Sequence, residues 1–322
     1  MQQQKILVLG GSGFIGTVLV TKLLQAGQDV RIIDKRISQE YPDITIQCDV
    51  RNAAALVEAC QGYDTIYNLA AEHKDNVTPR SLYDEVNVQG AHNTCRAAEQ
   101  CGIKKIIFTS SVAVYGFTRT EADESHPLQP FNDYGRTKME AEVVYHEWLT
   151  GGQDRSLVIV RPSVVFGVEN RGNVYNLLKQ IASHRFIMVG SGRNHKSMVY
   201  VENVAEFLKF ALQFDTGEHL FNYVDKPDFD MNSLVKLVKK NIHKPAEIGL
   251  RIPYFLGYLG GLGFDLLSLI TRKKFPISAI RVKKFCADTL FAAQRVQASG
   301  FTPPVAITTG LEKTIKAEFG RD

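Results

Sequence analysis

Gly10-Gly11-Ser12-Gly13-Phe14-Ile15-Gly16 is the stretch of sequence that decides the fold. It follows the apolar run Lys5-Ile6-Leu7-Val8-Leu9 and opens a pattern of helical spacing over residues 14–26. The first glycine permits a tight turn after a strand, the third lets a pyrophosphate approach the backbone, and the last lets the helix pack closely on the sheet. Free amides at the start of such a helix attract phosphate. The motif therefore predicts a strand–turn–helix unit that binds a dinucleotide.

The rest of the chain continues this alternation of strands and helices. Further apolar runs, each followed by polar residues, occupy 30–34, 64–69, 106–109 and 157–160. Helical patterns lie between them, at 53–60 and 91–101, and recur later at 173–183, 204–214 and 231–241. We expect an α/β protein with a Rossmann-type, doubly wound parallel sheet. We expect residues 1–165 to form its dinucleotide-binding domain, with some later segments returning to it, and residues 166–322 to form mainly a smaller substrate-binding lobe.

Acidic residues after the second and third apolar runs indicate which dinucleotide binds. Asp34 lies 18 residues after Gly16, where its carboxylate can accept hydrogen bonds from both ribose hydroxyls and repel a 2′-phosphate. NAD is therefore favoured over NADP, although Lys35 and Arg36 could partly offset the repulsion. Asp49 is placed to reach the adenine amino group, unless it is only an exposed acid in a loop.

A tyrosine and a lysine are spaced for acid–base chemistry. Tyr134 and Lys138 are one helical turn apart on the same face, and the ammonium would stabilise the tyrosinate and lower its pKa. Lys138 would also hold the nicotinamide ribose. Ser111, 23 residues before Tyr134, would hydrogen-bond the same substrate oxygen. A surface helix pair would show the same spacing, but the preceding glycine loop and Thr109-Ser110-Ser111 favour the catalytic interpretation.

Composition excludes several other classes of protein. The chain has 322 residues, of which 44% are hydrophobic and 22% charged, and this is ordinary for a globular enzyme. Its five cysteines are scattered and form no CxxC pair, so we expect reduced thiols, no metal site and a cytoplasmic location. The first residues lack the hydrophobic region of a signal peptide. The net charge of +4 is too small to indicate a nucleic-acid partner.

These motifs together resemble the extended short-chain dehydrogenase/reductase family, whose members act on nucleotide sugars. The supporting stretches besides the glycine loop are Asn68-Leu69-Ala70-Ala71, Asn87-Val88-Gln89-Gly90, Ser110-Ser111-Val112-Ala113-Val114-Tyr115-Gly116 and Arg161-Pro162. The resemblance implies that NAD is contacted by Gly10, Gly13, Phe14, Ile15, Gly16, Asp34, Asp49, Val50, Leu69, Ala70, Ala71, Asn87, Thr109, Tyr134, Lys138 and Pro162. Related 4,6-dehydratases carry an Asp-Glu pair after the catalytic hydroxyl. This chain has Val112-Ala113 there, which favours a 4-epimerase, although simple 4-keto reductases lack the pair too.

The same resemblance implies two contacts with the diphosphate of the substrate, Asn173 and Lys196. Galactose epimerases usually have arginine at the second position, and a lysine supplies charge without a bidentate fork. They also place an asparagine where this chain has Val164. Both departures weaken an assignment to UDP-sugars. The alternative interpretation is that Asn173 is a helix cap and Lys196 a solvated charge.

Residues 253–270 form an apolar segment that is unusual in a soluble enzyme. Pro253, four glycines and Asp265 argue against a membrane span. A helix or helical hairpin in the membrane interface would bring its basic flank to anionic headgroups. That flank consists of Arg272, Lys273, Lys274, Arg281, Lys283 and Lys284. The segment could instead be buried in the lobe or in a dimer contact.

Three further stretches resemble bacterial 4-epimerases that act on undecaprenyl-diphosphate-linked N-acetylglucosamine. They are residues 71–75, 171–180 and 281–286. This resemblance implies interconversion of GlcNAc and GalNAc on the lipid carrier in O-antigen synthesis, with peripheral contact at the cytoplasmic face of the inner membrane, and the wider family implies a homodimer. A UDP-GlcNAc 4-epimerase and a UDP-4-keto-sugar reductase remain alternatives. A non-catalytic dinucleotide sensor would not need Ser111, Tyr134 and Lys138.

Overall fold

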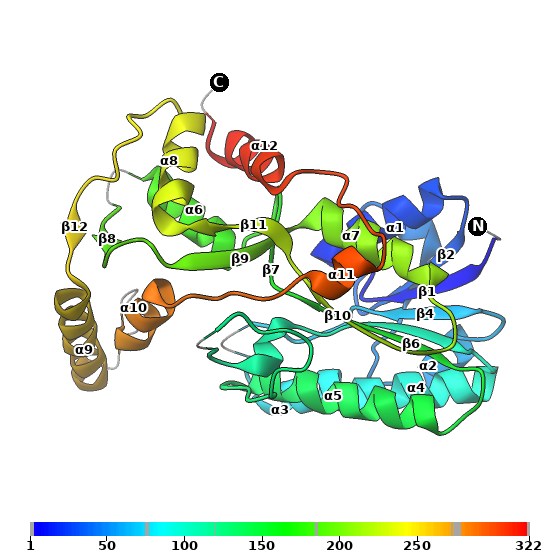
Figure 1. Cartoon of the computed structure of the whole chain (residues 1–322). Helices are drawn as coiled ribbons and strands as arrows, with labels where there is room; N and C mark the ends of the chain where they lie inside the picture. The colour runs from blue at the N-terminus through cyan, green and yellow to red at the C-terminus, as the bar shows by residue number, and fades with distance from the viewer. Residues whose placement is uncertain are drawn as a thin grey trace.

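The computed structural model describes residues 3–74, 77–118, 120–183, 186–271, 273 and 278–320. A seven-stranded parallel sheet forms its larger part (Figure 1), in the order β10-β6-β5-β4-β1-β2-β3. The strands are β1 (Lys5–Leu9), β2 (Asp29–Asp34), β3 (Thr45–Gln47), β4 (Thr65–Asn68), β5 (Lys105–Thr109), β6 (Ser156–Pro162) and β10 (Gly217–Tyr223). This topology confirms the predicted doubly wound fold. The strand order reverses between β1 and β4, where such sheets bind ligands.

Helices cover both faces of the sheet because alternate residues of each buried strand point to opposite sides and are apolar. Ile6 and Val8 of β1 pack in one core with α1 (Phe14–Gln25) and α7 (Val201–Phe210). Leu7 and Leu9 point to the opposite face and pack in a core with α2, α4 and α5. These three helices are Ala53–Ala59, Gly90–Cys101 and Asp133–Thr150. Figure 1 shows the two layers on either side of the sheet.

A second lobe is built from a three-stranded sheet and the helices packed on it. Its strands are β7 (Val164–Phe166), β9 (His195–Tyr200) and β11 (Asp225–Asp230), and its helices are α6 (Asn173–Ala182), α8 (Met231–Asn241) and α12 (Ile307–Phe319). Leu178, Leu234 and Leu311 lie in their shared core and are fully buried. The chain crosses back between the lobes, since β10, α7 and the short helix α11 (Gln294–Ala298) pack with the large sheet although they follow residue 165.

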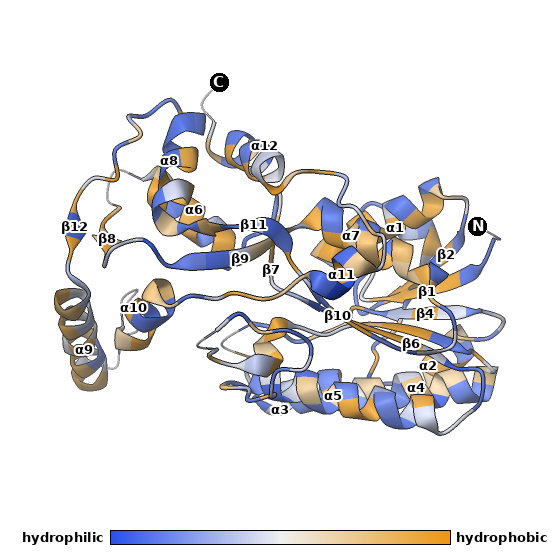
Figure 2. Ribbon diagram, in the orientation of Figure 1, coloured by the Kyte–Doolittle hydropathy of each residue, from blue (hydrophilic) through white to orange (hydrophobic). Residues whose placement is uncertain are grey.

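The apolar segment is a single helix, α9 (Tyr254–Thr271), so a helical hairpin is wrong. It lies beside α10 (Ala279–Cys286) at the edge of the second lobe, and the ribbon of α9 carries mainly hydrophobic colours in Figure 2. Only 6% of this 18-residue helix is buried, so the segment is not part of the core of the lobe. By length and composition it is long and apolar enough to cross a membrane. Arg272 and Lys274 of the predicted basic flank lie outside the described residues.

Candidate functional site

The turn between β1 and α1 has a geometry that only glycines satisfy. Gly10 adopts a φ of +78°, and a Cβ on it would lie 2.6 Å from the backbone nitrogen of Ala70. A Cβ on Gly16 would lie 2.5 Å from the carbonyl oxygen of Gly10. Gly13 is the N-cap of α1, and no side chain caps the first amides of that helix. The turn is therefore a close-packed cradle with backbone amides available to an anion.

Asp34 lies beside this turn at the end of β2. One carboxylate oxygen accepts a hydrogen bond from the Ser12 amide at 3.2 Å, and the other accepts from the Arg36 amide at 3.1 Å. The ammonium of Lys35 is paired with Glu72 at 2.9 Å. This pairing directs Lys35 toward Glu72, which limits how far it could offset repulsion of a 2′-phosphate.

Asp49 follows β3 and lines an open pocket of about 470 Å³ together with Arg51, Asn52, Glu85 and Gln89. Arg51 donates to both oxygens of the Asp49 carboxylate, at 3.1 and 2.9 Å, and its hydrogen bond holds the pKa of Asp49 below its ordinary value. The carboxylate is thus ionised and fixed at the rim of the pocket. Contact between Asp49 and an adenine stays a prediction.

Two buried asparagines hold the loop that follows β4. Asn68 accepts a hydrogen bond from the Ala70 amide at 3.0 Å and donates to the Tyr145 hydroxyl at 2.6 Å. Asn87, in the π-helix Asp84–Gln89, exchanges hydrogen bonds with the Glu72 backbone at 2.9 and 3.0 Å. Residues 69–71 are therefore fixed against the glycine turn. In this structure the Asn87 side chain positions the loop that faces the cofactor cradle, and its contact with NAD stays a prediction.

The three predicted catalytic residues come together where α5 approaches the end of β5. Asn132 caps α5 by accepting a hydrogen bond from the Gly135 amide at 2.9 Å, so Tyr134 lies in the first helical turn. A Cβ on Gly135 would lie only 2.4 Å from the Ala113 carbonyl oxygen, and this close approach brings the helix against the Ser111 segment. The Ser111 side chain acts on the Tyr134 hydroxyl and counteracts part of the rise in its pKa.

Lys138 is buried one turn further along α5. Its ammonium donates to the Thr109 carbonyl oxygen at 2.8 Å and lies 4.6 Å from the centre of the Phe108 ring. Burial lowers the pKa of Lys138 to about 7, although the nearby Glu142 carboxylate opposes this shift. Burial likewise raises the pKa of Tyr134, and the Ser111 side chain only partly offsets this. The predicted lowering of the Tyr134 pKa is therefore not found, because both groups are desolvated and Lys138 is directed at Thr109.

A buried ion pair that we did not predict lies beneath these residues. Arg161 of β6 donates to Glu142 of α5 at 2.6 and 2.9 Å, and their side chains are only 4% and 8% exposed. Glu142 also accepts a hydrogen bond from the Ser110 hydroxyl, and Arg161 donates to the Tyr115 hydroxyl at 2.7 Å. The pair joins α5 to the strand ends that carry the candidate site. Its one sequence signal was the position of Glu142 four residues after Lys138.

The residues around the strand ends fit a dinucleotide. Besides the glycine cradle and Asp34, the Thr109 hydroxyl oxygen is buried and has no hydrogen-bond partner among the described residues. A buried hydroxyl without a partner is costly unless a ligand or water meets it. Thr109, the last residue of β5, pairs with Val160 on the neighbouring strand β6. Pro162 ends β6 two residues later and so lies at the same edge of the sheet. The glycine cradle, the Asp34 carboxylate and the Thr109 hydroxyl all lie at the carboxyl ends of parallel strands in one sheet.

The two predicted substrate residues occupy different surroundings. Asn173 is exposed at the first position of α6 and is not its cap, which is Gly172. Lys196 of β9 donates to the carbonyl oxygens of Lys284 and Ala287 at 2.9 and 2.6 Å, at the end of α10. Burial lowers the pKa of Lys196 to about 8. It is therefore a partly desolvated cation at a helix C-terminus rather than a solvated charge.

Comparison with known proteins identifies the family. The sequence model of the NAD dependent epimerase/dehydratase family matches residues 6–223. The chain belongs to this family, and its cofactor is NAD. The match spans the glycine cradle, the candidate catalytic residues and all seven strands of the large sheet apart from the first residue of β1.

A relative that shares about half of its residues with this chain matches it over almost the entire length. It is the N-acetyl-alpha-D-glucosaminyl-diphospho-ditrans,octacis-undecaprenol 4-epimerase of Escherichia coli O157:H7, which is 51% identical over 316 residues, or 98% of this chain and 95% of that protein. Among solved structures, a UDP-N-acetylglucosamine 4-epimerase from Methanobrevibacter ruminantium M1 is 20% identical with a TM-score of 0.76, covering 98% of each chain. A Thermus thermophilus UDP-glucose 4-epimerase in complex with NAD is also 20% identical, with a TM-score of 0.76 over 98% of this chain and 99% of that one. The two structures establish the fold.

Proposed function

We propose that this chain is an NAD-dependent 4-epimerase that interconverts N-acetylglucosamine and N-acetylgalactosamine on undecaprenyl diphosphate. The observation that carries the proposal is the 51% identity with the Escherichia coli enzyme over 316 residues. The matched region covers 98% of this chain, so the similarity includes the second lobe as well as the large sheet. The product would begin repeats of a surface polysaccharide such as an O antigen.

The chain's own residues supply proton transfer and orientation. Tyr134, once ionised, removes the proton from the 4-hydroxyl of the sugar and later returns it. Ser111, whose side chain acts on the Tyr134 hydroxyl, would hold the same sugar oxygen. Lys138, one helical turn beyond Tyr134, would hold the nicotinamide ribose. Gly10, Gly13, Gly16 and Asp34 would hold NAD, which when bound accepts hydride from carbon 4 and gives it back.

A matched set of variants tests this assignment. Tyr134→Phe should reduce turnover by about 10²- to 10⁴-fold, the usual contribution of a positioned acid–base group, while purified protein keeps its NAD. Ser111→Ala should reduce turnover with the same retention of NAD. Reactions are run without added NAD(P)H, because an epimerase regenerates its cofactor in each cycle and a reductase consumes it. Activity that needs stoichiometric NAD(P)H would replace this proposal with a ketoreductase.

We also propose that α9 lies in the interface of the cytoplasmic face of the inner membrane. Its outward side chains are strongly exposed, with Phe255 at 61%, Leu269 at 79% and Ile270 at 72%. The helix contacts the lobe through small residues instead. A Cβ on Gly257 would meet Val189 at 2.5 Å, and one on Gly261 would meet the Ala279 backbone at 2.6 Å. Large apolar side chains therefore face outward on a helix that is anchored by its glycines.

Charge around α9 suits an anionic membrane surface. Asp265, the acidic residue in the helix, accepts a hydrogen bond from the Ala279 amide at 3.0 Å and so faces α10. Arg281 and Lys283 on α10 are exposed next to it. Basic residues beside an exposed apolar face are typical of interfacial helices.

Flotation with vesicles that contain anionic phospholipid tests the location. The double variant Leu266→Asp, Leu269→Asp should lose vesicle binding, whereas Ile46→Asp, at an exposed apolar position on the edge strand β3, should keep it. If the variant instead changes a dimer to a monomer in light scattering while wild type ignores vesicles, α9 is a dimer contact. The homodimer stays a prediction.

A further inference from the structure

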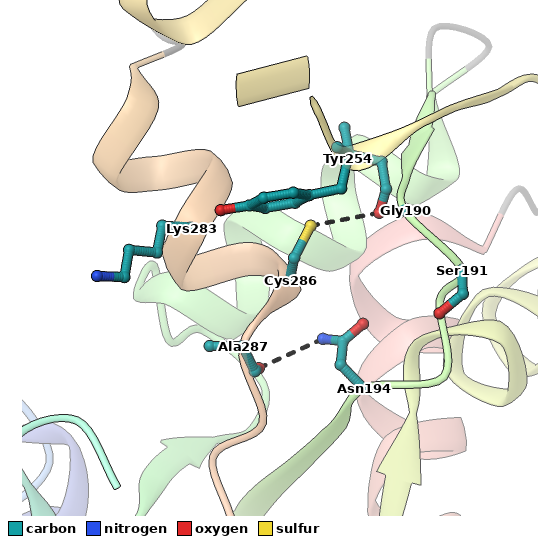
Figure 3. Close-up of a pocket in the computed structure, with 8 residues that line it drawn as sticks. Gly190, Ser191, Asn194, Tyr254, Lys283, Cys286 and Ala287 are labelled. Carbon is teal, nitrogen blue, oxygen red and sulfur yellow. Dashed lines mark hydrogen bonds between the residues drawn. The ribbon is translucent and has the colours of Figure 1, made fainter. Parts of the chain in front are cut away.

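A second pocket lies in the smaller lobe, between the β8–β9 connection and the helices α9 and α10. It has a volume of about 330 Å³ and is open to solvent. Its wall begins at Val189 in β8 (Met188–Val189), and β8 pairs with β12 (Arg251–Ile252) just before α9. Figure 3 shows Tyr254 lying across Cys286, with Lys283 on the same side and Ser191 opposite. The pocket thus has an apolar wall, polar donors and a cation.

Contacts connect this pocket to the candidate catalytic site. Lys283 lies 5.5 Å from the centre of the Phe117 ring, and the next residue, Lys284, lies 4.6 Å from the centre of the Phe131 ring. These two rings are stacked, 4.6 Å apart. Phe131 is three residues before Tyr134. The lysines of α10 therefore contact two aromatic rings, one of which, Phe131, lies just before the helix that carries Tyr134.

The other side of the pocket leads to the exposed helix. Tyr254, which lines the pocket, is the first residue of α9. Phe255 and Leu256 follow it and are 61% and 50% exposed. A molecule that extends from the catalytic site through the pocket would thus emerge along an apolar surface. A nucleoside has no need of such an exit, whereas an isoprenoid chain does.

The electrostatics of the pocket suit a phosphate. Among the described residues that line it, Lys283 is the one with a charge. The Lys196 ammonium lies behind the wall, on the carbonyl oxygen of the lining residue Ala287. Asn194, just before β9, donates to the Phe285 carbonyl of α10 at 2.8 Å and so joins the strand to the helix. Two cations thus lie at or behind an otherwise neutral pocket wall, and no carboxylate among the described lining residues opposes an anion.

We infer that this pocket binds the diphosphate and the first isoprenoid unit of a lipid-linked sugar, an inference that rests on the proposed function. Lys283 meets the diphosphate from the side of the catalytic rim. Tyr254 and Cys286 contact the first isoprenoid unit and direct the chain to α9. Specificity for the carrier is then determined by this wall, since the sugar alone occupies the space beside Tyr134.

The first test separates carrier binding from chemistry. Lys283→Met should raise the KM for a polyprenyl-diphosphate-linked GlcNAc by about tenfold, the loss expected for one charge-assisted hydrogen bond, and change kcat less than about twofold. Lys313→Met on α12 removes an equal charge at an exposed position and should leave both constants unchanged. An unchanged KM in Lys283→Met, with an active wild type, overturns the subsite. An inactive wild type would instead overturn the proposed function.

The second test uses Cys286 as a reporter and requires no turnover. Its thiol contacts the Val189 carbonyl at 3.4 Å, and burial raises its pKa, so alkylation by N-ethylmaleimide is followed at mildly alkaline pH. Farnesyl diphosphate should slow modification of Cys286 and leave that of Cys101, another half-buried thiol, unchanged. Equal protection by UDP would overturn the inference by assigning the pocket to a nucleotide. Absence of protection by farnesyl diphosphate would overturn it even if the epimerase activity is found.

Discussion

Lys138→Met replaces a buried ammonium by an apolar side chain of similar length, and we expect the variant to be more stable although it is inactive. Lys138 is 2% exposed, and burial lowers its pKa from 10.5 to about 7. At about 1.4 kcal/mol per pKa unit, the charged form destabilises the folded state by roughly 5 kcal/mol at or below pH 7. The buried charge of Lys138 therefore lowers the free energy of unfolding.

The net gain is smaller because methionine cannot replace the contacts of the ammonium. The hydrogen bond to the Thr109 carbonyl is lost, and a buried acceptor without a donor costs about 1–3 kcal/mol. The contact with the Phe108 ring is largely retained, since a thioether also packs well on an aromatic ring. We therefore expect a net stabilisation of about 2–4 kcal/mol, or a Tm about 3–6 °C higher for a chain of this size.

The pH dependence identifies the cause. Because the pKa of Lys138 is lower in the folded state, its charge destabilises the folded protein to the full extent below about pH 7. This destabilisation disappears as the pH rises to 10.5, the pKa of lysine in the unfolded chain. The difference in Tm between variant and wild type should thus be largest at pH 6.5 and shrink by pH 9.5, measured by calorimetry on NAD-free protein. Lys313→Met serves as the control and should show no gain. A variant that melts below wild type, or a gain that does not change with pH, would refute the reasoning.

Three other predictions concern the cradle and the buried charges. Gly10→Ala places a Cβ 2.6 Å from the Ala70 nitrogen at a φ of +78°, so the purified variant should retain less than about a tenth of the wild-type NAD, measured by absorbance after denaturation. Glu142→Gln breaks the buried pair with Arg161 and should lower the stability by about 3 kcal/mol in urea unfolding; an unchanged midpoint would contradict this. Burial raises the pKa of Asp225 to about 6, so the folded state binds its proton more tightly than the unfolded state does. Wild type should therefore lose about 2 kcal/mol more than Asp225→Asn as the pH rises from about 4 to 7, and equal slopes would contradict the assignment.

Local sequence signals predicted the elements and the convergence of the catalytic residues. β1 and α8 have the predicted bounds, and α1 begins at Phe14 as expected, because turn glycines and apolar periodicity act over a few residues. Ser111 lies just after the end of β5, and Tyr134 lies in the first turn of the next long helix, α5. The fold of the family brings these two positions close together. The parallel sheet then brings the glycine cradle to the same edge.

Contacts between distant segments could not be predicted in this way. Lys196 had the spacing of a strand residue, but its ammonium lies at the end of a helix about 90 residues later in the chain. The Glu142–Arg161 pair depends on how α5 packs on β6, which no local pattern encodes. The hydropathy of residues 253–270 indicated an apolar helix, but not that Gly257 and Gly261 would face the protein and leave the large side chains exposed.

Side-by-side conversion of two substrates tests the central claim most directly. Purified protein, with detergent and without added NAD(P)H, is given undecaprenyl-diphosphate-linked GlcNAc or UDP-GlcNAc, and formation of the GalNAc epimer is measured on each carrier. We predict conversion of the lipid-linked sugar and little or none of the UDP-sugar. Conversion of UDP-GlcNAc alone would contradict the account and make the protein a nucleotide-sugar epimerase.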